Sequence, residues 1–287
     1  MTGARASDRA APVGQLEALG RARVALGCVF LLRTTPLLAP LHIPLFADAY
    51  PLLGWPDGHA HLAPFIPALP DDARALLCVA RTIAALAFTL GLLARPAGLL
   101  AGALGYLTVL QDPAHFYATF HVLFLGVIIL SCTDAVGQCA LRPRAPQSPT
   151  SSASLVRAWV ASIYAWAAIA KLRPDWLDGR TLELFARGDM LRPVVVRHFL
   201  ATESQRSFVA WAVVVLEFAL APLLLYRRTR RAGLVLALAM HAALEFATAP
   251  DVFGWAMVAL LLAFWTPSAV WPGTQRIARR IAHRILR

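Results

Sequence analysis

Apolar runs of about twenty residues recur along most of this chain and are separated by short polar segments. An apolar run of that length crosses the hydrocarbon core of a bilayer as an α-helix, whereas a strand would show alternation of polar and apolar residues. The pattern predicts eight membrane-spanning helices, the third and fourth separated by the turn signal Gln111-Asp112-Pro113. The predicted spans are 24–45, 73–93, 97–110, 114–131, 155–172, 208–226, 232–249 and 252–270.

Composition agrees with a membrane protein that has no soluble domain. Of the 287 residues, 59% are hydrophobic and 15% are charged, whereas soluble domains carry about 25% charged residues. The predicted fold class is all-α, a polytopic integral membrane helical bundle of about eight transmembrane helices. Residues 1–20 contain no apolar core followed by a small-residue cleavage site, so we expect the first span to act as its own insertion signal.

The distribution of arginine predicts the orientation of these spans. If the N-terminus is cytoplasmic, 17 of the 26 arginines fall in the inside segments, and the outside loops 46–72, 111–113 and 250–251 contain none. The long outside loop 173–207 is mixed, with six arginines offset by five carboxylates. The positive-inside rule therefore predicts a multi-pass cell-membrane protein with both termini cytoplasmic.

The net charge of +11 does not indicate a nucleic-acid partner, because the arginines flank apolar runs rather than covering one face. Topology signalling and contact with anionic lipid headgroups explain that placement better, so membrane lipid is the expected partner.

Two segments outside the spans have a composition of their own. Residues 142–154 are rich in Pro, Ser and Thr, which predicts a flexible cytoplasmic linker between two four-span halves. The transmembrane domain is expected to cover residues 1–272, followed by a basic amphipathic cytoplasmic tail over 273–287. None of the four cysteines has Cys-x-x-Cys spacing, so neither a disulfide framework nor a metal site is expected.

Ionisable residues inside the predicted spans are the candidates for chemistry, because charged groups in a bilayer are costly and usually functional. One interpretation is structural: Arg33 or Arg81 pairs with Glu217 or Glu245 and holds the bundle together. Histidines in such positions can also serve only as hydrogen-bonded core residues. The full set is Arg33, Arg81, Lys171, Glu217, Glu245, His115, His121 and His241.

Lys171 differs from the other candidates because it is the sole lysine among 27 basic residues. Arginine keeps its proton in any protein environment, whereas a desolvated lysine can lose its proton near neutral pH. A buried neutral amine is a general base. The alternative is a lysine at the end of the fifth span that extends to the headgroups as a membrane anchor.

The sequence around Lys171 resembles a known family motif. Residues 164–179 read YAWAAIAKLRPDWLDG and are similar to the Y-x-x-A-G-x-x-K-L-x-x-D-W-x-x-G element of vitamin K-dependent gamma-carboxylases and their bacterial relatives, the horizontally transferred transmembrane (HTTM) domain family. Two further elements agree in order and spacing with that family. They are His115-Phe116-Tyr117 on the fourth span, and His241 followed by Phe253, Trp255, Met257 and Trp271-Pro272.

The resemblance implies that Lys171 is the base that deprotonates a reduced quinone, which then reacts with oxygen. His115 would support the same site and His241 is a weaker candidate, so we expect Lys171 and His115 to line one cavity with Trp176 near its mouth and Asp175 beside it. The implied cofactor is reduced menaquinone or vitamin K hydroquinone, and the implied activity is that of a carboxylase-like or epoxidase-like lyase.

Departures from the family pattern leave other functions open. Ala168 and Ala114 replace residues that the family often has as Gly and Asn, and a large extracytoplasmic domain after the last span, which the carboxylases carry, is not expected here. Carboxylation of a protein is therefore less expected than chemistry on a quinol, although a small peptide or protein remains a candidate substrate. The alternatives are a non-catalytic membrane maturation or immunity factor, or a DoxX-like quinone-binding redox partner, whose G-x-x-x-R-P turns resemble residues 91–96.

Overall fold

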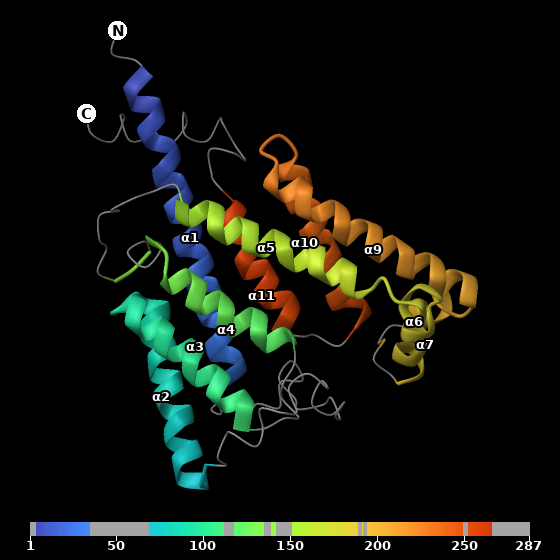
Figure 1. Cartoon of the computed structure of the whole chain (residues 1–287), viewed down its shortest axis with the longest axis horizontal. Coiled ribbons are helices and arrows are strands. Elements are labelled where there is room, and N and C mark those ends of the chain that lie inside the picture. Colours follow the sequence, from blue (N-terminus) through green and yellow to red (C-terminus); the bar gives the residue numbers. More distant parts are fainter. Residues whose placement is uncertain are drawn as a thin grey trace.

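The computed structural model describes residues 4–34, 69–111, 118–134, 139–141, 151–188, 191, 194–248 and 252–265. Within these ranges all regular elements are helices, and Leu191 and Thr248 form one isolated antiparallel bridge. The all-α prediction is therefore confirmed. In chain order the elements (Figure 1) are α1 (Ala4–Thr34), α2 (Asp71–Leu90), α3 (Ala94–Gln111), α4 (Ala118–Ser131), α5 (Ser151–Ala170), α6 (Pro174–Leu177), α7 (Arg180–Arg187), α8 (Val194–Phe199), α9 (Glu203–Leu225), α10 (Arg230–Ala247), α11 (Val252–Leu261) and the 3-10 helix η6 (Leu262–Phe264).

Each of the eight predicted apolar segments coincides with one of these helices or with part of one. The first lies on the second half of α1, and the last covers α11 and η6. Residues 35–45 and 266–270 of those two segments, together with the predicted tail 273–287, lie outside the described residues. The linker prediction was too long at its C-terminal end, because residues 151–154 already belong to α5 and residues 142–150 lie outside the described ranges.

Among the described residues, two helices are long and apolar enough to cross a membrane: the stretch Ser152–Ala170 of α5 and the whole of α9. Only 39% of the apolar stretch in α5 and 28% of that in α9 is buried in the bundle. Their outer faces carry large exposed side chains such as Trp166 and Val215. An outward apolar face of this kind suits surrounding lipid. The other apolar helices are shorter, so eight crossings stay a prediction.

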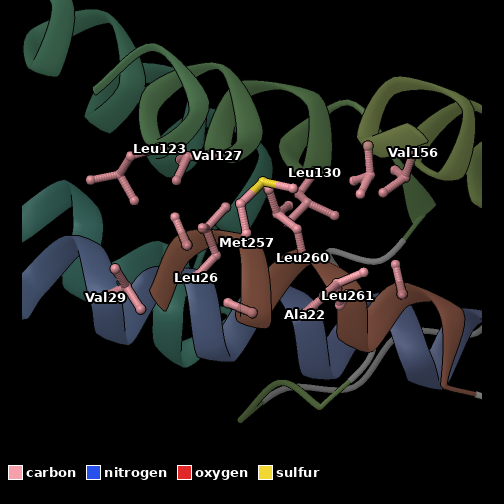
Figure 2. Packing of buried hydrophobic residues seen from close by; sticks show 14 of the residues in the cluster. Ala22, Leu26, Val29, Leu123, Val127, Leu130, Val156, Met257, Leu260 and Leu261 are labelled. Atoms are coloured by element: carbon pink, nitrogen blue, oxygen red, sulfur yellow. The ribbon is translucent and has the colours of Figure 1, made fainter. Parts of the chain in front are cut away.

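One apolar core joins the first four helices to the last. Consecutive helices α1, α2, α3 and α4 pack on one another, and α11 packs against both α1 and α4. In Figure 2, Leu26 of α1, Leu123 and Val127 of α4, and Met257 and Leu260 of α11 gather in one apolar cluster. Residues from both ends of the described chain therefore share one core, rather than forming two separate four-helix halves.

The second group of helices is built around α9, which packs against both α5 and α10 (Figure 1). A capping box at Thr202 and Gln205 starts α9 by satisfying the free N–H groups of its first turn. Its buried residues recur every three or four positions, as expected for a helix with one face in the bundle. They are Ala210, Val214, Glu217, Leu220 and Leu224.

The predicted outside loop 173–207 contains three short helices, α6, α7 and α8, with a small core of their own. That core comprises Leu182, Leu191, Leu200 and Ala210, so it joins the short helices to the first half of α9. Trp176 packs against it. The segment after α5 is therefore held in place against α9 rather than spanning the gap as an irregular loop.

Arg23, one residue before the predicted first span, is buried in the structure. It lies within α1 with no exposed surface and donates to the carbonyl oxygens of Phe88 and Thr89, at 2.9 Å for Thr89, where α2 ends. A third bond, of 3.0 Å, reaches the carbonyl oxygen of Cys139. The last carbonyls of a helix have no partner within it, so Arg23 satisfies the end of α2.

Two further arginines from the same predicted side bind helix ends in the second group. Arg157, in α5, is 5% exposed and donates from Nε to the carbonyl oxygen of Ala263 in η6, at 3.1 Å. Arg230, the first residue of α10, donates to the carbonyl oxygens of Leu224 and Leu225 at the end of α9, both at 3.1 Å. These arginines stabilise helix termini as well as carrying positive charge.

Candidate functional site

Lys171 and Glu217 form an ion pair between the C-terminal end of α5 and the middle of α9. The Nζ atom of Lys171 donates to both carboxylate oxygens of Glu217 at 2.8 Å, and to the backbone oxygen of Ala167 at 3.3 Å. The side chain of Lys171 is 23% exposed and that of Glu217 is 9% exposed. The lysine is thus held within the bundle by a carboxylate, and it does not extend away from the protein as a membrane anchor would.

Helical periodicity explains why these two side chains meet. Glu217 lies on the buried face of α9, with Val214 and Leu220 three residues to either side. Tyr164 is buried on the inner face of α5, and Lys171 follows it by seven residues, which is close to two helical turns. Lys171 therefore continues the inward face of α5 one turn past its last buried residues, opposite Glu217.

The residues after Lys171 hold its surroundings in place. The ring centre of Trp176 in α6 lies 5.4 Å from Nζ of Lys171, within the range of a cation–π contact. The indole N–H of Trp176 donates to the backbone oxygen of Ala210 in α9, at 3.4 Å. The chain then turns at Gly179, which has φ of +82°. A β-carbon there would collide with the backbone of Arg206, so the position requires glycine.

A second polar pair lies deeper in the same group of helices. The hydroxyl of Tyr164 in α5 and Nε2 of His241 in α10 are 2.9 Å apart, and both residues are buried. Glu217 is near enough for its charge to act on the Tyr164 hydroxyl. The ring of Phe253 in α11 packs on His241 with a centroid separation of 6.0 Å. Four polar side chains from three helices, α5, α9 and α10, therefore lie in one region.

The structure shows the partner of one intramembrane carboxylate, Glu217, and the predicted pairing of Arg33 or Arg81 with Glu245 stays a prediction. Glu217 is bound by Lys171, whereas sequence analysis had offered it as a partner for Arg33 or Arg81. Arg81 is buried on α2, and Glu245 is half-buried on α10 with its carboxylate over Gly254. The sequence could not identify the partner of Glu217, because hydropathy does not specify which helices are neighbours.

Other candidate residues lie elsewhere or outside the described residues. The carboxylate of Asp175 is exposed and pairs with Arg173 at 3.3 Å, so it is turned to a surface arginine. His115 and the side chain of Arg33 lie outside the described residues, and the predicted cavity between His115 and Lys171 stays a prediction. Within the described residues, no group of three or more His, Cys, Asp or Glu side chains is arranged as metal ligands would be.

Sequence analysis quoted Tyr164 as part of the motif but did not select it as a site residue. Its seven-residue spacing from Lys171 was the available signal, since positions seven apart share a helix face. Chemically, the four side chains offer an acid–base pair at Lys171 and Glu217, and a hydroxyl bonded to an imidazole at Tyr164 and His241. Such a region can accept and hold a proton inside an apolar bundle.

The fold and this site define a helical membrane protein with a lysine–glutamate pair between its two longest apolar helices. The chain belongs to the HTTM domain family, whose model matches residues 16–269. It is therefore a membrane protein related to the membrane domain of the gamma-carboxylases, as the motif around Lys171 had indicated. No curated protein and no solved structure matches the chain.

Proposed function

We propose that this protein acts on a lipid-soluble quinol, and that the pair of Lys171 and Glu217 accepts the quinol proton. The observation that carries the proposal is the bidentate contact between Nζ and the Glu217 carboxylate, at 2.8 Å to each oxygen, inside an otherwise apolar helix interface. A pair of this kind carries no net charge before the reaction, so it can remain in a low-dielectric region at modest cost.

The surroundings of the pair fit an aromatic, membrane-soluble ligand. Lys171 keeps 23% of its side chain exposed, so a ligand in the bilayer can approach its amine. Apolar side chains flank the pair on both helices, including Leu172 on the α5 side and Phe218 on α9, each more than 40% exposed. Trp176 offers a ring face beside the amine, and flat aromatic groups stack on such faces.

The proton count explains why a pair is more useful than a lone amine. Lys171 and Glu217 together hold one exchangeable proton when the pair is neutral, either as ammonium and carboxylate or as amine and carboxylic acid. Accepting a second proton gives an ammonium beside a carboxylic acid, with a net charge of +1. That positive charge stabilises the anion left on the donor oxygen. When bound, a reduced quinone supplies the acidic hydroxyl and, on oxidation, two electrons.

The Tyr164–His241 pair supports this role, because its hydrogen bond orients the Tyr164 hydroxyl near Glu217. Its hydrogen bond fixes the Tyr164 hydroxyl in the region where the Glu217 charge acts. A hydroxyl held there can donate to the carboxylate or relay a proton toward the imidazole. We assign Tyr164 and His241 as positioning residues for the acid–base pair.

The decisive variant is Lys171→Arg, which keeps a positive charge beside Glu217 but removes the amine that can be neutral and take a proton from the quinol. We expect the full-length protein in lipid nanodiscs, with reduced menaquinone and with oxygen as the two-electron acceptor, to lose quinol oxidation by roughly 10²–10⁴-fold in this variant, which is the usual contribution of a general base. Arg173→Lys is the matched control, because Arg173 is two residues away and its guanidinium is exposed. It should retain turnover.

Three results would distinguish the proposal from the alternatives. Menaquinone that copurifies with the wild-type protein, together with turnover that depends on Lys171, supports the proposal. Bound menaquinone without turnover favours a redox partner. Unchanged turnover in Lys171→Arg, at normal expression and thermal stability, would return Lys171 to a structural role.

A further inference from the structure

One face of the short helix α8 is apolar and exposed. Its six residues read VVVRHF, and Val194, Val195 and Phe199 are between 57% and 64% exposed. Residues that are adjacent or four apart lie on one side of a helix, so these three form a single outward face. Leu184 on the preceding helix α7 is 66% exposed as well. An exposed apolar face marks a surface that meets lipid or another protein.

The contacts of α8 hold this face outward. On its other side, Val196 and Leu200 pack in the small core that α8 shares with α7 and α9. Arg206 of α9 donates from Nη1 to the carbonyl oxygens of Leu200, at 3.2 Å, and Ala201, at 3.0 Å. Its Nη2 donates to the carboxylate of Glu183 on α7 at 3.3 Å. The end of α8 is thus tied to both neighbouring helices, and turning its apolar face inward would break these bonds.

The position of α8 along α9 sets its depth in a membrane. With 23 residues, α9 is roughly 34 Å long, slightly more than the ~30 Å hydrocarbon core of a bilayer. The polar first turn of α9, residues 203–206, therefore lies at headgroup level. The small core joins α8 to Ala210, seven residues and about 10 Å further along α9. This places α8 at the boundary between headgroups and acyl chains.

Exposed residues at the same level of α9 are apolar. Phe208 and Trp211, on either side of Ala210 in sequence, are 69% and 49% exposed. They belong to the outward face of α9 that suits surrounding lipid. Aromatic residues near the end of a span are typical of the membrane interface. The surroundings at the level of α8 are therefore apolar, as its own outward face requires.

We propose that α8 is an interfacial helix whose outward face, Val194, Val195 and Phe199, is embedded in the lipid bilayer. It lies in the leaflet around the first half of α9, which is the outer leaflet in the predicted orientation. Helices of this kind lie at the boundary between headgroups and acyl chains with their apolar face buried in lipid. The membrane then supports the group of short helices that holds Trp176 beside Lys171. This role does not depend on quinol chemistry.

The neighbouring helix α7 presents a polar exterior, which provides a matched control. Arg180, its first residue, pairs with Asp178 at 3.1 Å, and its side chain is 78% exposed. Exposed ion pairs are at home in water or among headgroups and are costly in hydrocarbon. The proposal therefore assigns Val195 to lipid and Arg180 to the aqueous side of the same group of short helices.

The experiment measures the depth of single residues in the full-length protein in lipid nanodiscs. Val195, Arg180 and Val215 are replaced one at a time by p-acetylphenylalanine, which takes a nitroxide label without altering the four native cysteines. All three positions are exposed, so the label leaves the core intact. Electron paramagnetic resonance then compares collisions of the label with oxygen, which concentrates among acyl chains, and with a water-soluble nickel chelate. Val215, in the apolar stretch of α9, is the lipid reference.

The collision ratios separate lipid from the other possible occupants of the α8 face. We expect the oxygen-to-nickel ratio at position 195 to be several-fold higher than at 180 and to lie below that at 215. Equal ratios at 195 and 180 would place the face in water and overturn the proposal. Few collisions of either kind at 195 would mean that a protein segment covers the face, and dipolar broadening between labels at 195 would mean that a second copy does. Either result would also overturn it.

Discussion

A lysine and a glutamate inside an apolar bundle depend on each other more than two surface residues do. Removing one partner leaves the other charge without compensation, whereas the pair together is nearly neutral. The amine of Lys171 also donates to the backbone oxygen of Ala167, so its position is fixed by two hydrogen-bonded residues. At the scale of single residues, the site is therefore a fixed acid–base pair with a hydrogen-bonded tyrosine and histidine behind it.

Tyr164→Phe tests whether that second pair matters to the first. The change removes only the hydroxyl, leaving the buried Nε2 of His241 without its bond, and should lower the free energy of unfolding by about 1–2 kcal/mol. Tyr106→Phe is the matched control, because its hydroxyl lies 3.2 Å from Nδ1 of His121, away from the site. Both should lose stability in thermal unfolding. Only Tyr164→Phe should also change the pH profile of quinol turnover, and identical profiles would limit Tyr164 to packing.

At the scale of elements, the short helices α6, α7 and α8 fix the surroundings of Lys171, which the long helices alone do not. Two residues separate α6 from α7, and the small core under α6, α7 and α8 holds Trp176 against α9 and beside Lys171. Sequence analysis treated this stretch as a loop, because helices of four to eight residues are too short to show a period. The motif residues that follow Lys171 therefore hold Trp176 beside the Lys171 amine.

Gly179→Ala is the sharpest test of this small core. Its φ of +82° lies in the left-handed region, where a β-carbon is strained, and that atom would also meet the Arg206 backbone. We expect a loss of about 1–3 kcal/mol in the free energy of unfolding. Hydrogen exchange should show faster exchange in α6 and α7, with little change in α2 and α3. A uniform increase across all helices would contradict a local role.

Arg23 gives a second prediction at this scale, because it stabilises the end of α2. Arg23→Met keeps the side-chain length but removes the donor to the carbonyl oxygens of Thr89 and Cys139, so we expect a loss of about 3 kcal/mol. Arg21→Ala is the control: Arg21 forms a partly exposed ion pair with Glu17 in the same helix, and the expected change is below about 1 kcal/mol. Equal effects in chemical denaturation would mean that Arg23 contributes only its charge.

For the whole molecule, the sequence predicted properties of single segments, such as the length of an apolar helix. It did not predict which segments contact one another. Apolar length identified each of the eight segments, because hydropathy is local. It could not show that α11 packs against α1, or that Lys171 meets Glu217 across 46 residues, because helix neighbours depend on the complete core. The tally of arginines along the chain also could not show that Arg23 and Arg157 are buried, because burial depends on the packing of several helices.

The orientation of the whole bundle is the remaining prediction, and the capping arginines make it more specific. Arg23, Arg157 and Arg230 bind the ends of α2, η6 and α9, all of which lie on the predicted cytoplasmic side. Helix contacts between the ends of different spans require that those ends share one side of the membrane. We therefore expect reporter fusions after residues 148, 229 and 287 to be cytoplasmic, and those after 60, 190 and 250 to be extracytoplasmic. An extracytoplasmic signal at 229, beside four arginines, would overturn both the topology and the assignment of Lys171 to the outer half of the bilayer.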